Sequence, residues 1–147
     1  KQQNRQCENK LQKNADTWAV LAVLLGMEYP SGMLTQAWKY FLANQSHDSI
    51  AGCSVDLVHE DVEYRNRQIR HLADNITRKS MGYIVKNINN SHLPEDVVCM
   101  IAFNPTQFQR TEVVNVVIDI PAETNASWFT VEDDDGNEVG RGTFEPG

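Results

Sequence analysis

The residues of this sequence that could do chemistry are concentrated in residues 44–54 (NQSHDSIAGCS). His47 could bind a metal ion through one ring nitrogen, and the adjacent Asp48 could bind the same metal or accept hydrogen bonds from hydroxyl groups. A zinc-type site needs at least three protein ligands, so the partners of His47 would have to come from elsewhere. The alternative is structural, with Asp48 or Ser49 capping a short turn and His47 packed nearby.

A second cluster, residues 59–63 (HEDVE), resembles the HExxH zinc motif only in part. That motif needs two histidines one helical turn apart, but residue 63 is Glu, so the second ligand is missing. We expect these acidic residues to lie in the solvated first turn of a helix, where they interact favourably with its dipole. His71 and His92 have no evident partners, and Cys53 is expected to be a small buried hydrophobic residue.

The spacing of apolar residues predicts an amphipathic helix over residues 7–25. Gly26 can adopt the left-handed conformation that ends such a helix, and Pro30 prevents its continuation. The predicted buried stripe has apolar residues three or four apart: Cys7, Leu11, Ala15, Trp18, Ala22 and Leu25.

Two further helices are predicted, and they flank the His-Asp segment. One begins near Ser31, a plausible N-cap, and ends around residue 44; the other runs from after residue 54 to about residue 89. Because the connections are short, the three helices should pack as an antiparallel bundle. Arg65 falls in the apolar stripe of the third helix, so it should either pair with a carboxylate or mark a contact with another domain.

The pattern changes at residues 89–94, where Asn, Ser and Pro are turn and breaker signals and β-branched residues become frequent afterwards. Strands are predicted over residues 96–103, 112–120, 128–132 and 138–144. The Asp-Gly pair within residues 134–137 is a strong hairpin signal. The expected fold class is therefore α+β, with an antiparallel three-helix bundle (residues 1–90) followed by the first strands of an antiparallel β-sandwich (residues 95–147).

Length and composition exclude several classes of protein. The chain has 147 residues, 41% of them apolar, which supports a real core and argues against disorder. Thirteen Lys and Arg against twenty Asp and Glu give a net charge of -7, which argues against a nucleic-acid partner. No apolar stretch approaches the roughly 20 residues of a membrane-spanning helix, so no membrane partner is expected.

The three cysteines, Cys7, Cys53 and Cys99, cannot form a complete disulfide framework, which favours a reducing, cytoplasmic location. Four Asn-x-Ser/Thr sequons count weakly against that location. The chain starts within a helical pattern and ends just after a strand-like segment, so we expect it to be part of a longer protein.

Residues 44–56 (NQSHDSIAGCSVD) closely resemble the His-Asp segment of glycoside hydrolase family 38, the retaining α-mannosidases. The similarity extends to Val58-His59, Arg65, Tyr29-Pro30, Ala37-Trp38-Lys39 and residues 98–105 (VCMIAFNP). It spans most of the chain, and it implies that residues up to about 90 are the three-helix middle domain. Residues 98–105 would then open the β-rich C-terminal region.

The resemblance also implies a zinc site. Members of the family bind one zinc ion (Zn2+) in the −1 sugar subsite; the corresponding ligand here is His47, and Asp48 would contact the mannose hydroxyls. The family's other ligands, its nucleophile and its acid/base carboxylate belong to an N-terminal α/β domain with no counterpart in this sequence. No catalytic residue is therefore expected here, and the chain by itself should neither hydrolyse glycosides nor hold zinc tightly. Ser46 stands where many relatives have a second His or another residue.

The sequence is therefore compatible with two functions. In the first, the chain is part of a zinc-dependent α-mannosidase that acts on an α-mannoside, with the N-terminal α/β domain and the rest of the C-terminal domain as partners within one polypeptide. In the second, it is a non-catalytic helical interaction module with a structural His-Asp cap. The first requires His47 and Asp48 to lie together at a solvent-open concave end, with His47 free to accept a metal. The second expects both to be buried and fully hydrogen-bonded within the chain. The segment does not distinguish α-mannosidases from mannosylglycerate hydrolases.

Overall fold

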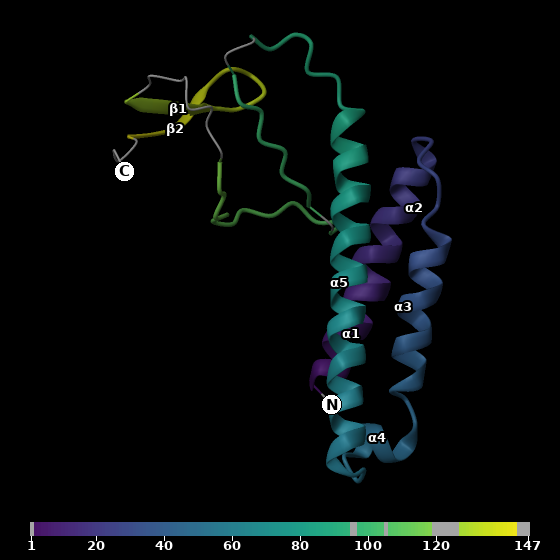
Figure 1. The fold of residues 1–147 in the computed structure, drawn as a ribbon. Coiled ribbons are helices and arrows are strands. Elements are labelled where there is room, and N and C mark those ends of the chain that lie inside the picture. Colours follow the sequence, from purple (N-terminus) through teal and green to yellow (C-terminus); the bar gives the residue numbers. More distant parts are fainter. Residues whose placement is uncertain (1, 95–96, 105, 119–126, 144–147) are drawn as a thin grey trace. The chain divides into compact units, whose positions relative to one another are not determined.

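The computed structural model describes residues 2–94, 97–104, 106–118 and 127–143 (Figure 1). The chain divides into two compact units, Lys1–Ala102 and Phe103–Gly147. Helical structure ends well before this division, at Lys86, so the domain limits 1–90 and 95–147 stay predictions. The helical elements of the first unit are α1 (Gln2–Asn9), the π-helix η1 (Lys10–Asp16), α2 (Thr17–Leu24), α3 (Ser31–Ala43), α4 (His47–Ala51) and α5 (Asp56–Lys86).

The elements α1, η1 and α2 follow one another directly and form the first rod of the bundle. In a regular α-helix, four residues overshoot a full turn by about 40°, so apolar residues four apart drift around the helix. The wider π-helical turn compensates for this drift and keeps the buried residues on one side. The Thr17 hydroxyl donates to the Gln12 carbonyl at 3.0 Å within this stretch. The buried residues of the rod are Cys7, Leu11, Ala15, Ala19 and Ala22, so Ala19 takes the place predicted for Trp18.

The core lies where the first rod, α3 and α5 meet. Gly26, with a φ of 103°, ends the first rod and lets the chain reverse into α3; α5 reverses again, so the three rods run antiparallel (Figure 1). Buried apolar residues from all three rods form one cluster, to which α3 gives Leu34, Ala37 and Phe41, and α5 gives Ile69, Ala73 and Ile76. The predicted α+β class and the three-rod bundle are confirmed.

In the second unit, the described residues form an antiparallel hairpin of β1 (Trp128–Glu132) and β2 (Glu138–Thr143), with Trp128 opposite Thr143. The predicted Asp-Gly turn is confirmed, and Gly136 has the left-handed φ of 79° that this turn requires. Asp133 organises the turn, because its carboxylate accepts hydrogen bonds from the backbone N–H groups of Asn137 at 2.8 Å and Asp135 at 3.0 Å. These bonds, chiefly that from Asn137, hold the pKa of Asp133 below its usual value.

The strands predicted at residues 96–103 and 112–120 were wrong for the parts that the structure describes, residues 97–103 and 112–118. Val113 and Val117 are about nine-tenths exposed, at 95% and 94%. Alternation of apolar residues defines the two faces of a strand, but it supplies no hydrogen-bonding neighbour, and strands form only in pairs. Residues 96, 119 and 120 lie outside the described part, as does residue 144 of the predicted fourth strand. Within the described residues, the predicted sandwich is therefore a single two-stranded sheet.

Among the described residues, no helix combines the length and the apolar character needed to cross a lipid bilayer.

Candidate functional site

His47 and Asp48 open α4, the short helix that joins α3 to α5 at one end of the bundle (Figure 1). Ser46 precedes the helix in an extended conformation, with a ψ of 137° that turns the chain out of α3. Its hydroxyl hydrogen-bonds that of Ser49 at 2.8 Å. At the other end, Gly52 has a left-handed φ of 82° and its N–H donates to the Asp48 carbonyl at 3.0 Å. Local backbone hydrogen bonds therefore hold the α4 turn together. The His47 and Asp48 side chains at its start take no part in those backbone bonds.

The His47 and Asp48 side chains lie side by side in solvent. Their exposed fractions are 93% and 63%, and His47 Nε2 lies 3.0 Å from Asp48 Oδ1. A carboxylate beside an imidazole can orient the ring, and both groups are free to contact a ligand from outside. This exposure differs from the burial that a structural His-Asp cap would require.

The described residues offer no complete metal site, since no group of three or more His, Cys, Asp and Glu side chains is placed to hold an ion. His47 and Asp48 together offer one imidazole and one carboxylate, which are suitable zinc donors but too few. His59 and Glu63 lie in the first turns of α5, as the sequence predicts. Cys53 is exposed, contrary to prediction, because it follows Gly52 in the open connection between α4 and α5.

Directly behind this turn lie two buried asparagines that the sequence analysis missed. Asn44 at the end of α3 and Asn66 in α5 are each only 3% exposed. Asn44 Nδ2 donates to Asn66 Oδ1 at 3.1 Å and to the Val62 carbonyl at 3.4 Å. The available signal was positional: Asn66 lies four residues after Val62 and three before Ile69, within the apolar stripe of α5.

Arg65 completes the hydrogen bonding of Asn44. Its guanidinium donates to Asn44 Oδ1 at 3.2 Å and to the Asp61 carboxylate, one helical turn away, at 3.3 Å. Of the two roles predicted for Arg65, pairing with a carboxylate is confirmed. The pair with Asp61 is partly exposed, so it contributes little stability by itself.

The first rod joins the same polar cluster. Gln45 Nε2 donates to Asn4 Oδ1 at 2.8 Å, and Asn66 Nδ2 donates to Gln3 Oε1 at 3.3 Å. The Cys7 thiol lies 3.5 Å from Asn66 Oδ1. Burial raises the pKa of Cys7, so this thiol stays protonated and serves as a weak donor rather than a nucleophile.

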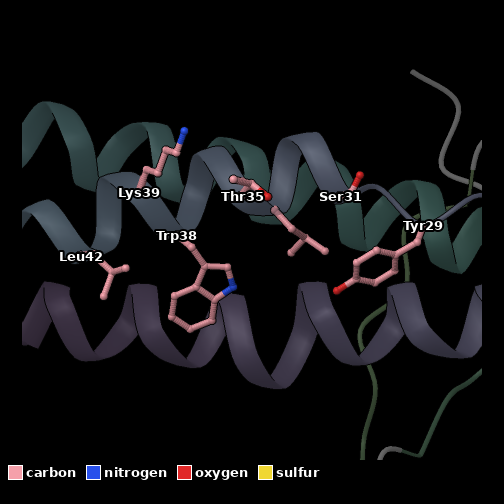
Figure 2. Close-up of a pocket in the computed structure, with 7 residues that line it drawn as sticks. Tyr29, Ser31, Thr35, Trp38, Lys39 and Leu42 are labelled. Carbon is pink, nitrogen blue, oxygen red and sulfur yellow. The ribbon is translucent and has the colours of Figure 1, made fainter.

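A groove with a volume of about 340 Å³ runs along α3, and the residues that line it come from α3 and from Tyr29 just before it. Figure 2 shows the Trp38 indole and the Tyr29 phenol extending toward the helix of the first rod, with Lys39 and Leu42 along α3. The Tyr29 hydroxyl donates to Asp16 Oδ1 at 2.6 Å, and this bond, with some burial, raises the pKa of Tyr29 to about 12. Tyr29, Trp38 and Lys39, which extend the family resemblance, therefore line one groove along α3.

A family model described as "Alpha mannosidase middle domain" matches residues 1–84, which is more than half of the chain. The chain belongs to this family. The resemblance to glycoside hydrolase family 38 inferred from residues 44–56 is thereby confirmed, and residues 1–84 are its middle domain. A putative mannosylglycerate hydrolase of Halalkalibacterium halodurans is 31% identical over 64 residues, which are 44% of this chain and 7% of that protein. The chain thus spans a small part of this relative's length, and no solved structure matches it.

Proposed function

We propose that this middle domain is part of a zinc-dependent retaining α-mannosidase, in which His47 supplies one zinc ligand and Asp48 binds the sugar. The observation that carries the proposal is the exposure of both side chains, 93% and 63%, at the turn between α3 and α5. If a second domain supplies the remaining zinc ligands, the ligand in this domain has to be accessible until the two domains meet. The N-terminal α/β domain, the rest of the C-terminal domain and the α-mannoside are the proposed partners.

Each side chain has a distinct role in this proposal. His47 would offer a neutral imidazole nitrogen, while Asp48 would accept hydrogen bonds from vicinal sugar hydroxyls. Such bonds strengthen as positive charge develops on the sugar ring, so Asp48 would favour the transition state over the bound substrate. His47, with ligands from the N-terminal domain, would hold the zinc ion, which would supply Lewis-acid chemistry at the mannose ring. The nucleophile and the acid/base carboxylate would come from the N-terminal domain.

The name of the relative from Halalkalibacterium halodurans suggests mannosylglycerate as one substrate within this class. An α-mannosidase with another aglycone is equally compatible with His47 and Asp48, because both would act on the mannose ring. A cytoplasmic location fits the three cysteines, all of which are free thiols.

The zinc role is tested by His47→Ala in the full-length protein. We expect a large loss of both bound zinc and turnover, measured by metal analysis and by hydrolysis of an aryl α-mannoside. The control is His71→Ala, which removes another exposed imidazole, from α5. Normal zinc content in His47→Ala would refute the ligand role.

Asp48→Asn separates sugar binding from metal binding. The amide keeps the shape of the carboxylate but is a weaker acceptor for sugar hydroxyls, so we expect turnover to fall while much of the zinc is retained. Asp134→Asn, an exposed carboxylate of the hairpin turn, is the control. An unchanged rate in Asp48→Asn would remove this residue from the substrate site.

A further inference from the structure

The two residues that precede the Ser46-His47 turn are held by their side chains, each to a different rod. Asn44 is bonded to α5 through Asn66, the Val62 carbonyl and Arg65. Both donor hydrogens and the carbonyl oxygen of its side-chain amide are used, in surroundings where Asn44 is 3% exposed.

Gln45 is bonded to the first rod. Its amide donates to Asn4 Oδ1 at 2.8 Å, and Asn4 Nδ2 lies 3.4 Å from Gln45 Oε1, so the two amides face each other with both pairs of atoms matched. Gln45 Nε2 also lies 3.1 Å from the Phe41 carbonyl in the last turn of α3. The end of α3 is thereby fixed against both other rods.

Polar groups in this position are costly unless they are fully bonded, and an apolar residue at Asn44 would pack without that requirement. What the amides add is direction, because a hydrogen bond fixes distance and angle whereas an apolar contact tolerates sliding. The α4 turn itself has no buried residue, so its position depends on the points where it is attached.

We propose that Asn44 and Gln45 are positioning residues. They hold the end of α3 so that α4 places His47 and Asp48 where zinc and sugar bind. This inference rests on the function proposed above. Asn44 and Gln45 touch neither ligand in this account; they act by keeping the turn in one arrangement. The polar cluster is thus a supporting shell for a site that the rest of the protein completes.

The test is Asn44→Ala in the full-length protein, with two measurements. Loss of a supporting hydrogen bond typically weakens metal binding about 10- to 100-fold, and we expect a rise of that size in the zinc Kd. Hydrogen exchange should also become faster at the amides of Ile50, Gly52 and Cys53, which donate to the Ser46 and Asp48 carbonyls. The second measurement is made on the zinc-free protein, so it does not depend on metal or turnover.

The control is Ile76→Val, a fully buried residue of α5 that loses core packing and is expected to lower Tm. It should leave the zinc Kd and the exchange of the three α4 amides unchanged. If Asn44→Ala does not fold, Gln45→Ala, a less buried change, takes its place with the same expectations. An unchanged zinc Kd and unchanged α4 exchange in a folded variant would overturn the positioning role, as would equal effects in Ile76→Val.

His47→Ala belongs in the same series because it separates the two proposals. If His47→Ala loses zinc while Asn44→Ala and Gln45→Ala bind it normally, the zinc role stands and the positioning role fails. If His47→Ala keeps its zinc, the proposed function itself fails. If all three lose zinc affinity and Ile76→Val does not, both proposals are supported.

Discussion

At the scale of single residues, the three cysteines differ in what surrounds them. Cys7 is buried with its pKa raised, whereas Cys53 and Cys99 are exposed. Because the thiolate is the reactive form and access is needed, we predict that iodoacetamide modifies Cys53 and Cys99 in the folded protein and leaves Cys7 intact. Mass spectrometry of digested protein measures this directly, with urea-unfolded protein as the control in which all three react. Equal labelling of Cys7 in folded protein would contradict the packing of the first rod.

The bond between Tyr29 and Asp16 predicts a pH dependence of stability. The pKa of Tyr29 is raised from 10.0 to about 12, so the folded state favours the protonated phenol. The resulting stabilisation is present in full below pH 10, and it is lost as the pH rises toward 12. Tyr29→Phe should therefore lower Tm slightly at neutral pH, and the difference from wild type should vanish near the upper end of this range.

The size of the Tyr29 effect is small because its side chain is substantially exposed. Asp16→Ala removes the acceptor of this hydrogen bond, so in that background Tyr29→Phe should no longer change Tm in a pH-dependent way. If the difference in Tm between wild type and Tyr29→Phe is the same at neutral and at alkaline pH, the hydrogen bond does not stabilise the fold.

At the scale of elements, two glycines give a matched pair of substitutions. Gly52 ends α4 with a φ of 82°, while Gly82 lies inside α5, and a Cβ would meet nothing within 4 Å at either position. We predict that Gly82→Ala stabilises the protein by about 0.5–1 kcal/mol through helix propensity, whereas Gly52→Ala is destabilising by about 1–2 kcal/mol through backbone strain. Urea unfolding measures both. Equal effects of the two substitutions would contradict the left-handed end of α4.

Helices and strands could be predicted where the hydrogen bonds that stabilise them join residues close together in the sequence. The three helices follow from apolar spacing and from breakers such as Gly26 and Pro30, since a helix bonds within itself. The strands predicted at residues 96–103 and 112–120 failed in the parts that the structure describes, residues 97–103 and 112–118, because a strand needs a partner elsewhere in the chain. The hairpin succeeded because the Asp-Gly turn places its two strands beside each other.

The candidate site was predictable only in part. Apolar spacing placed residues 44–54 between two helices, but the zinc role proposed for His47 rests on family resemblance, since one histidine is not a site. The buried Asn44–Asn66 pair was missed because asparagine side chains usually face solvent. The burial of this pair depends on how the three rods pack together. The spacing of residues along one rod does not predict that packing.

At the scale of the whole molecule, the donors available for a metal ion decide how tightly zinc can bind. The described residues hold no group of three metal-binding side chains, so we expect the 147-residue chain to bind zinc weakly. We predict that dialysis against a mild chelator removes zinc from this chain readily, whereas the full-length protein keeps one ion and hydrolyses an α-mannoside. Stoichiometric zinc retained by the 147-residue chain would show that the site lies within it.

The most direct test of the central claim is anomalous diffraction at the zinc absorption edge from crystals of the full-length protein. Our account predicts one zinc peak about 2.0–2.1 Å from an imidazole nitrogen of His47, with the remaining ligands from the N-terminal domain. A zinc peak held entirely by other residues, with the His47 imidazole pointing elsewhere, would contradict it.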